Sequence, residues 1–163
     1  MPSFGCQSMS LPLQRVLMRA PRESLLNANP QQWHYGPTFD GAKALKQYQF
    51  FRSLVAACGT EIIDIEDHND GLSDAMFTFD PSLVSDHGAI ILNMGKPLRK
   101  AEPVLHEQAY INAGIPILGH VKGEGQIEGG DCIWLDHNTL AVGRGFRSNQ
   151  AGIDQLNAML NSH

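Results

Sequence analysis

The chain has 163 residues, of which 42% are hydrophobic and 18% are charged, as is typical of a single globular domain with a sizeable core. Its formal net charge of −5 argues against partners with dense negative charge, so we expect neither nucleic acid nor a membrane as a partner. No apolar run approaches the ~18 residues that span a bilayer, and the first residues lack the pattern of a secretory signal. The 3 cysteines show no disulfide or zinc spacing, which favours reduced thiols in a cytoplasmic protein.

Local patterns divide the first part of the chain into a tail, a strand, a long loop and a helix. Apolar residues recur at helical spacing between Asp40, a plausible N-cap, and Gly59, a plausible C′ glycine. The other predicted segments are a loose tail over 1–10, a strand over 14–18, a loop over 24–39 that is rich in Asn, Gln, Pro and Gly, and a strand over 60–65.

The rest of the chain repeats one order of elements, strand–strand–helix–strand, at a spacing of roughly 50 residues. The predicted strands are 75–79, 89–92, 115–121, 133–135 and 139–142, and the predicted helices are 99–113 and 149–160. The last unit stops after its helix, in mid-pattern. We therefore expect an α/β fold in which residues 1–163 form a single domain, the N-terminal portion of a longer repeat fold.

Short motifs lie at the joints of these units. The first runs from Asp74 to Pro81, and its two acids, Asp74 and Asp80, are an even number of positions apart, so in a strand they would face the same side. The second motif, 95–102, contains Arg99 and opens a predicted helix.

The third and fourth motifs are Glu128-Gly129-Gly130-Asp131 and Arg147-Ser148-Asn149. A glycine pair permits close backbone approach or positive φ, which lets the two flanking carboxylates converge on a small cation. Read alone, acid-Gly-Gly-acid is also an ordinary turn signal. The fourth motif lies at the start of the last predicted helix.

In this order, the four motifs resemble the guanidino-group modifying superfamily of dimethylarginine dimethylaminohydrolases, arginine deiminases and amidinotransferases. The resemblance covers almost the whole chain and implies a five-bladed α/β propeller, the pentein fold, built from pseudo-repeated ββαβ units and truncated here after about two and a half of them. It implies a hydrolase of the guanidino C–N bond of arginine or methylated arginine, which gives citrulline through a Cys-linked intermediate and needs neither cofactor nor metal.

The resemblance also assigns roles to residues. Glu128 matches the acid at the active-site centre, Asp74 and Asp80 match a guanidinium-binding segment, and Arg99 and Arg147 match arginines that bind the substrate's α-carboxylate. Asp131 is the least specific: it could bind substrate, hold the turn or orient the catalytic histidine. Carboxylates suit this task because a guanidinium presents its donors in a planar fork. Strand caps for the acids and a solvated Arg147 are the structural alternatives.

The family's catalytic histidine and cysteine have no match in this chain. Cys132 follows Asp131 in an apolar run and is expected to be a buried core thiol; Cys58 lies on the apolar stripe of the first helix, and Cys6 lies in the tail. We therefore expect the chain as given to bind poorly and to turn over nothing.

Dimethylargininase is the best single prediction, because the covered part shows no extra domain or insertion. An arginine deiminase or amidinotransferase relative is the alternative. Phe79 departs from the acid or arginine that the two hydrolase subfamilies have at this position, which leaves the choice between methylarginine and arginine open. A rival interpretation is a non-catalytic fragment that binds a guanidino ligand or associates, as a homodimer or with a complementary chain, through an open propeller edge. The run from Asp64 to His68 could be a metal patch, but its spacing favours a solvated loop.

Overall fold

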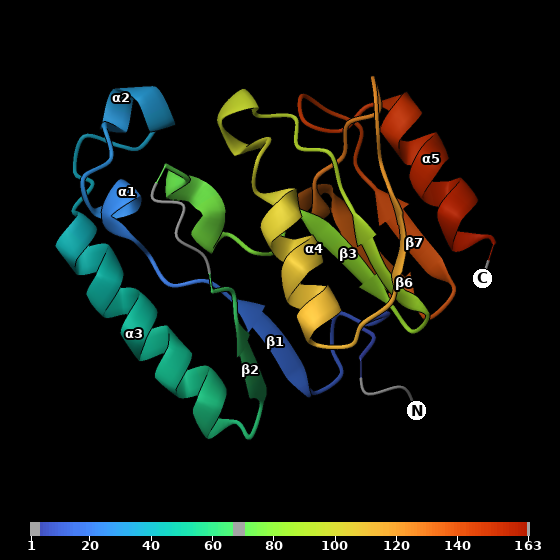
Figure 1. Ribbon diagram of the computed structural model, residues 1–163, viewed down its shortest axis with the longest axis horizontal. Helices are drawn as coiled ribbons and strands as arrows, with labels where there is room; N and C mark the ends of the chain where they lie inside the picture. Colours follow the sequence, from blue (N-terminus) through green and yellow to red (C-terminus); the bar gives the residue numbers. More distant parts are fainter. Residues whose placement is uncertain (1–3, 67–70, 163) are drawn as a thin grey trace. The chain divides into compact units, whose positions relative to one another are not determined.

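The computed structural model describes residues 4–66 and 71–162, and the chain forms two compact units. One unit consists of residues 13–77; the other joins the segment before Leu13 to the chain from Thr78 onward. Figure 1 labels the helices and strands of both units. The single-domain assignment of residues 1–163 stays a prediction.

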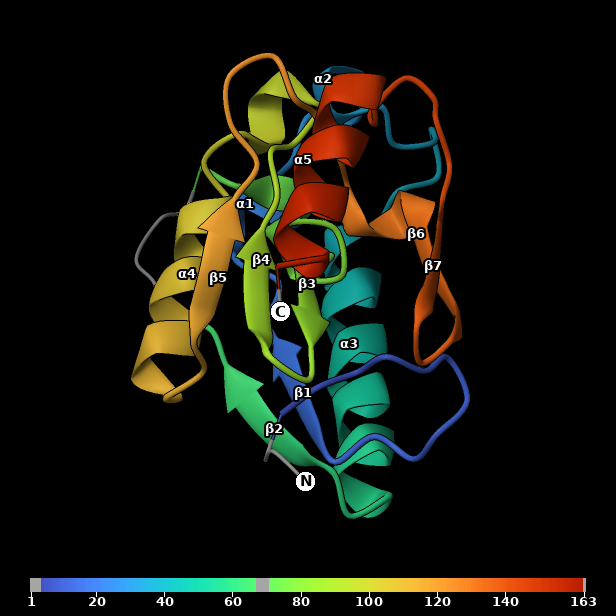
Figure 2. The ribbon, with the colours of Figure 1, turned by 90° about the vertical axis from the view of Figure 1, so that its right-hand side faces the viewer.

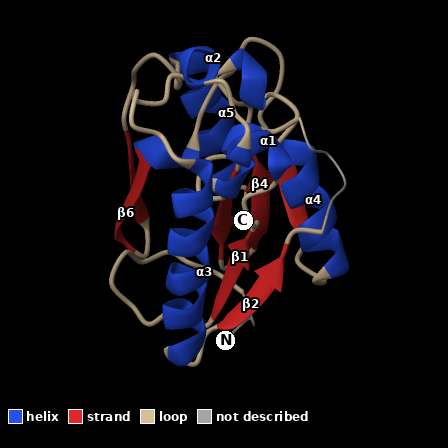
Figure 3. Cartoon of the chain, turned by 90° about the vertical axis from the view of Figure 1, so that its left-hand side faces the viewer, coloured by secondary structure: helices blue, strands red, loops and turns tan. Residues whose placement is uncertain are grey.

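The unit of residues 13–77 contains a parallel strand pair, β1 (Arg15–Met18) and β2 (Glu61–Asp64), connected through α3 (Gly41–Ala57) (Figure 3). Parallel strands need such a crossover because a hairpin cannot join them. The Asp40 carboxylate accepts a hydrogen bond from Lys43 N at 3.0 Å, and Gly59 has a φ of 79°. Both predicted ends of this helix are therefore confirmed.

Other expectations for this unit are wrong. Two short helices, α1 (Glu23–Leu26) and α2 (Pro30–Trp33), replace the long loop predicted over 24–39. The Asn29 side chain caps α2 by accepting from two backbone amides, and Pro30 supplies a fixed φ at the first helical position. The apolar stripe of α3 is only partly buried: Tyr48 is buried, whereas Leu54 and Cys58 are exposed.

The strand predicted over 75–79 is a 3-10 helix, η1 (Ser73–Met76). One local and one long-range hydrogen bond accompany the difference: Phe77 N donates to Asp74 O at 2.9 Å, and Ser73 Oγ donates to Ser24 O, 49 residues away in the sequence, at 2.7 Å. Asp74 and Asp80 therefore do not share a strand face, and they belong to different units.

The unit that continues from Thr78 contains a three-stranded sheet in the order β3 (Ser82–Ser85), β4 (Gly88–Ile91), β5 (Ile117–His120). β3 pairs antiparallel with β4, and β4 pairs parallel with β5 through the crossover helix α4 (Pro103–Asn112), which packs beside them (Figure 2). Residues 82–88, expected to be only a connection, thus include a strand. The helix expected from Arg99 begins at Pro103, a residue favoured at this position, while Pro97–Arg99 form the 3-10 turn η2.

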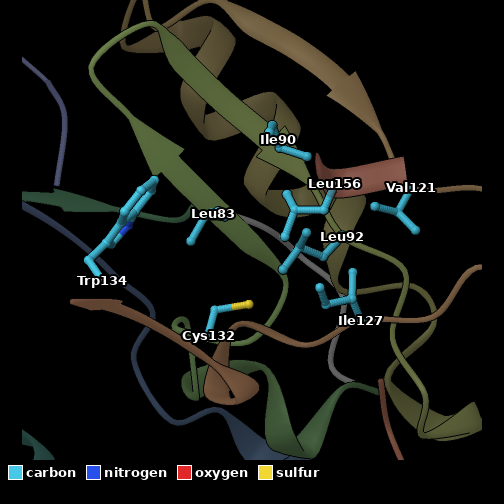
Figure 4. Packing of buried hydrophobic residues seen from close by; sticks show 8 residues of the cluster. All are labelled: Leu83, Ile90, Leu92, Val121, Ile127, Cys132, Trp134 and Leu156. Carbon is cyan, nitrogen blue, oxygen red and sulfur yellow. The ribbon is translucent and has the colours of Figure 1, made fainter. Parts of the chain in front are cut away.

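The same unit contains the antiparallel hairpin of β6 (Cys132–Asp136) and β7 (Thr139–Val142), preceded by η3 (Gly129–Asp131) and followed by α5 (Gln150–Leu160). The predicted strand over 139–142 and the predicted C-terminal helix are confirmed. Side chains from both sheets, from the loop before η3 and from α5 form one core (Figure 4): Leu83, Ile90, Leu92, Val121, Ile127, Cys132, Trp134 and Leu156.

Cys132 lies in this core, 2% exposed, as the sequence predicted. Burial, followed by the negative charge of Asp131, raises the pKa of its thiol to about 12. A thiol with this pKa stays protonated near neutral pH and is a poor nucleophile. Cys132 is therefore a structural residue.

Candidate active site

Asp80 lies at the centre of a buried charge network in the unit that continues from Thr78. Its Oδ2 is 2.6 Å from Arg99 Nη1, and its Oδ1 accepts a hydrogen bond from Gly130 N at 3.1 Å. Arg99 also donates from Nε and Nη2 to Glu102, at 2.9 and 2.7 Å. Burial would lower the pKa of Arg99, but the hydrogen bonds and charges of Glu102 and then Asp80 raise it above its usual value. Two carboxylates therefore hold Arg99 as a permanent cation.

The Glu128 side chain is held by the backbone of another segment. It is 1% exposed, and its Oε1 accepts hydrogen bonds from Gly95 N at 3.0 Å and from Lys96 N at 3.4 Å. Its Oε2 is 2.9 Å from Arg147 Nη1. Because one oxygen is fixed by amides, the direction of the carboxylate is fixed as well.

Ser148 links the two acids of the Glu-Gly-Gly-Asp motif. Its hydroxyl donates to Asp131 Oδ2 at 2.5 Å and accepts from Glu128 N at 3.2 Å. The backbone oxygen of Asp131 also accepts a hydrogen bond from Gly143 N at 2.8 Å. Asp131 therefore fixes the loop that carries Ser148, and through it the backbone of Glu128.

The glycine pair, Gly129 and Gly130, is required because another segment approaches it closely. Close approach was one of the two explanations that the sequence suggested, the other being positive φ. A Cβ at Gly129 would clash with the backbone oxygen of Phe79, and a Cβ at Gly130 would lie 2.7 Å from Asp80 Oδ1. Gly129 N also donates to Asp80 O at 2.8 Å. The pair thus lets the Asp80 segment lie directly against the motif.

Asp74 belongs to the other unit, residues 13–77. Its side chain is 5% exposed and lies in η1, where Tyr35 Oη donates to its Oδ1 at 2.5 Å. A cavity of about 480 Å³ lies in the same unit, lined mainly by aromatic and aliphatic side chains that include Tyr35, Phe39 and Phe77. This unit therefore combines a buried carboxylate with a largely apolar cavity.

The structure thus brings five of the six predicted residues into one unit and links them in pairs: Asp80 with Arg99, Glu128 with Arg147, and Asp131 with Glu128 through Ser148. The ligand-binding roles of all six stay predictions. Arg99 in this structure binds protein carboxylates, and the sequence analysis did not assign that partnership. The i, i+3 spacing of Arg99 and Glu102 was the signal that could have revealed it.

Sequence reasoning also missed a buried polar cluster beside this network. Ser82 Oγ is 2.9 Å from His106 Nδ1 and 2.7 Å from Tyr110 Oη. Burial, followed by the positive charge of Arg99, lowers the pKa of His106 to about 3. The i, i+4 spacing of His106 and Tyr110 placed both on one face of a helix, but nothing in the sequence identified Ser82 as their partner.

Within residues 4–66 and 71–162, no three His, Cys, Asp or Glu side chains are grouped so as to hold a metal ion. The metal patch considered at Asp64–His68 falls partly outside the described residues. In the part of the chain that the structure describes, no helix has the length and apolar character needed to cross a membrane.

Comparison with known proteins places these features in context. A family profile described as arginine deiminase matches residues 60–163. The dimethylarginine dimethylaminohydrolase of Streptomyces coelicolor is 33% identical over 119 residues, which cover 73% of this chain and 45% of that protein. The chain spans about half the length of three curated relatives, with coverages of 45%, 52% and 57%, and 23% of the length of an arginine deiminase from Listeria welshimeri.

Solved structures are similar over nearly the whole chain. Dimethylarginine dimethylaminohydrolase from Pseudomonas aeruginosa, solved with citrulline, has a TM-score of 0.78 at 24% identity and matches 94% of this chain and 58% of its own. A cyanobacterial arginine dihydrolase has a TM-score of 0.75 at 19% identity and matches 90% of this chain and 22% of its own. At these identities the likeness establishes the α/β fold of this group, whereas the truncation and the number of repeats stay predictions.

Proposed function

This chain belongs to the arginine deiminase family, and on that premise we propose that it supplies the guanidinium-binding side of an enzyme that hydrolyses a guanidino C–N bond. The geometry of Glu128 carries the proposal. This buried carboxylate is fixed through Oε1 by backbone amides, while Oε2 lies next to a guanidinium, that of Arg147. A carboxylate fixed in this way is preorganised for a planar cation with paired donors.

In the proposed reaction, a cysteine thiolate adds to the guanidino carbon and the C–N bond breaks, so that the amine leaves with a proton from a histidine. Water then adds to the carbon of the amidino adduct, and the C–S bond breaks to give citrulline and the thiolate. Glu128 and Asp80 would hold the cationic group in place, and Arg147 would bind the carboxylate at the other end of the substrate. Asp74, in the unit of residues 13–77, stays a separate candidate for binding substrate.

The thiol and the histidine of this reaction are not assigned to residues 1–163. Cys132 is buried and has a raised pKa, and His106 is buried and has a lowered pKa. We therefore propose that polypeptide beyond these residues supplies both groups and that residues 1–163 alone are inactive.

Dimethylargininase is the preferred activity, supported by the 33% identity to the Streptomyces coelicolor enzyme. Arginine deiminase, supported by the family profile, is the alternative, together with an amidinotransferase relative. Phe79 is 57% exposed beside Asp80, where it could contact the methyl groups of a methylated guanidinium. We further propose a cytoplasmic location, which agrees with the free thiols of Cys6, Cys58 and Cys132.

A second candidate is a non-catalytic fragment that associates with another chain or with a second copy of itself. It is favoured by the exposed apolar face of β6, where Ile133 and Leu135 are 50% and 66% exposed. Apolar side chains in adjacent exposed positions on one strand face are typical of a surface that another polypeptide covers.

The intact mass of the protein in its native source, paired with a citrulline assay on dimethylarginine and on arginine, separates the two candidates. A mass well above 17.9 kDa with citrulline release would support the enzyme, and the preferred substrate would assign the subfamily. A mass of 17.9 kDa without turnover would support the fragment.

A further inference from the structure

The two oxygens of Glu128 have different environments. Oε1 accepts hydrogen bonds from two backbone amides, Gly95 N and Lys96 N. Oε2 is buried and lies 2.9 Å from Arg147 Nη1, yet within the described residues it accepts no hydrogen bond of good geometry. Arg147 thus neutralises the charge of Oε2 without giving this oxygen an aligned donor, and an aligned donor would bind it more strongly.

The backbone of Arg147 is fixed, whereas its side chain can move. A Cβ at Gly95 would lie 2.6 Å from Arg147 Cα, which shows how tightly the two segments pack, and the neighbouring Ser148 is bonded to Asp131 and Glu128. The Arg147 side chain is nevertheless 54% exposed, whereas that of Glu128 is 2% exposed. A rotation of side-chain torsions, without backbone movement, would release Oε2 from Arg147.

The group that Arg147 presents to Glu128 is itself a guanidinium, the group that the proposed substrate carries. We propose that Arg147 is a specificity-determining residue that occupies the guanidinium site of the ligand-free protein and must be displaced by any guanidinium ligand. A ligand that also carries a carboxylate gives the displaced Arg147 a new partner, whereas a simple guanidine does not. This inference rests on the proposed function and deepens it, because it gives Arg147 a regulatory role at the guanidinium site.

The competition is effective because Arg147 is tethered. An intramolecular partner acts at an effective concentration in the millimolar range or above, so a free guanidine must exceed that concentration or bind with better geometry. A guanidino amino acid avoids most of this disadvantage. The ion pair between Arg147 and Glu128 is replaced by two, one between the ligand's guanidinium and Glu128 and one between the ligand's carboxylate and Arg147. The residue therefore discriminates against small guanidines without any steric barrier.

The test compares Arg147→Met, which keeps the length of the side chain but removes its charge, with Arg144→Met, which makes the same change at an exposed arginine of the same loop. Methylguanidinium and L-arginine are titrated at constant ionic strength into the 163-residue chain, with backbone amide resonances of Gly95 and Gly130 as the readout. We expect Arg147→Met to bind methylguanidinium about tenfold more tightly and to lose at least as much of its preference for arginine. Arg144→Met should leave both affinities unchanged.

A second measurement needs no substitution. In the wild-type chain, nitrogen NMR of the Arg147 side chain should show the slow rotation of a guanidinium that is paired with a carboxylate. Methylguanidinium should replace this signal by that of an unpaired guanidinium. Arginine should instead give a second paired signal, from Arg147 bound to the carboxylate of the ligand. Equal methylguanidinium affinities of the wild-type and Arg147→Met chains, with an unchanged Arg147 signal, would overturn the inference and leave the proposed function intact. Absence of binding by both ligands to every variant would instead overturn the proposed function.

Discussion

Arg99 is a buried cation that binds two carboxylates, and its charge adds to the effect of burial on the protonation of His106. His106 is 1% exposed, and burial together with the charge of Arg99 lowers its pKa to about 3. Its Nδ1 is 2.9 Å from Ser82 Oγ, which also contacts Tyr110. Protonation would place a second cation next to Arg99, so the fold keeps this ring neutral at physiological pH.

Acid should therefore destabilise the fold through His106. The unfolded chain regains a pKa of about 6.5, so between pH 6.5 and 3 the unfolded state binds more protons than the folded state, and the free energy of unfolding falls as the pH falls. The slope from this group approaches ~1.4 kcal/mol per pH unit. Urea titrations between neutral and acidic pH should show a shallower loss for His106→Gln than for the wild type.

His137→Gln provides the control for this experiment. Its ring is exposed and bonded to Asp86, which together with Asn138 raises the pKa of His137, so its contribution has the opposite sign and is present below pH 6.5. This variant should lose stability in acid at least as steeply as the wild type. Parallel profiles for the wild type and His106→Gln would show that His106 is not the acid-sensitive group.

Gly129→Ala tests the close approach behind the Glu-Gly-Gly-Asp motif. The added methyl group would collide with the backbone oxygen of Phe79, which cannot rotate away as a side chain could. We expect a loss of about 2–4 kcal/mol in the free energy of unfolding, measured by urea denaturation. Gly145→Ala is the matched control, because a Cβ there meets nothing within 4 Å, and it should change stability by less than ~0.5 kcal/mol.

At the scale of elements, the start of α5 positions the segment that leads to Glu128. Asn149 caps the helix by accepting from Gly152 N at 2.9 Å, and the same oxygen accepts from Gln126 N at 3.0 Å. Its amide nitrogen donates to Glu124 O at 2.8 Å. One side chain therefore joins the helix to the loop before the motif.

Replacing Asn149 should lower the free energy of unfolding more than replacing a residue that only caps a helix. We expect Asn149→Ala to lower the free energy of unfolding by about 2–3 kcal/mol, because three hydrogen bonds are lost. Asp40→Ala, which removes a cap at α3 with a single such bond to Lys43 N, should cost about 1 kcal/mol. Equal losses on thermal denaturation would mean that the contacts of Asn149 with the loop contribute nothing.

The elements that sequence predicted well are those whose signals are local. The cap at Asp40, the glycine at 59 and the strand of residues 139–142 needed no information from distant segments. The segment 75–79 looked like a strand by composition, but the hydrogen bond from Ser73 to Ser24 favours a 3-10 turn instead. Tertiary contacts of this kind outweigh local propensity and leave no mark on a single sequence.

The candidate site, like the fold, has features that the sequence indicates and contacts that it does not. Residue types and their order led to the prediction that Asp80, Glu128 and Arg147 bind substrate, but they did not indicate which protein groups each side chain contacts. Glu128 is held by backbone amides of a segment more than thirty residues away in the sequence, at Gly95 and Lys96. Because any residue except proline offers such an amide, no side-chain pattern could have predicted this contact.

At the scale of the whole molecule, the sheets differ in how completely they are built. Strands β3, β4 and β5 form a three-stranded sheet, whereas β6–β7 and β1–β2 are two-stranded. A two-stranded sheet is marginal by itself and is usually stabilised by further strands or by packing on its faces. One face of β6 packs into the core through Cys132 and Trp134, and its other face presents Ile133 and Leu135 to solvent.

This face should make the 163-residue chain associate when it is alone in solution. Ile133 and Leu135 both belong to β6 and are 50% and 66% exposed, so this strand offers two large apolar side chains to solvent. Leu135→Lys should shift sedimentation-velocity profiles toward the monomer without lowering the melting temperature, because an exposed leucine contributes little to folding. Phe146→Lys alters a side chain that is even more exposed, 106%, but lies outside the strands, and it should leave association unchanged. If both variants dissociate alike, association reflects general surface hydrophobicity; if only Leu135→Lys does, the outer face of β6 is where a second polypeptide binds.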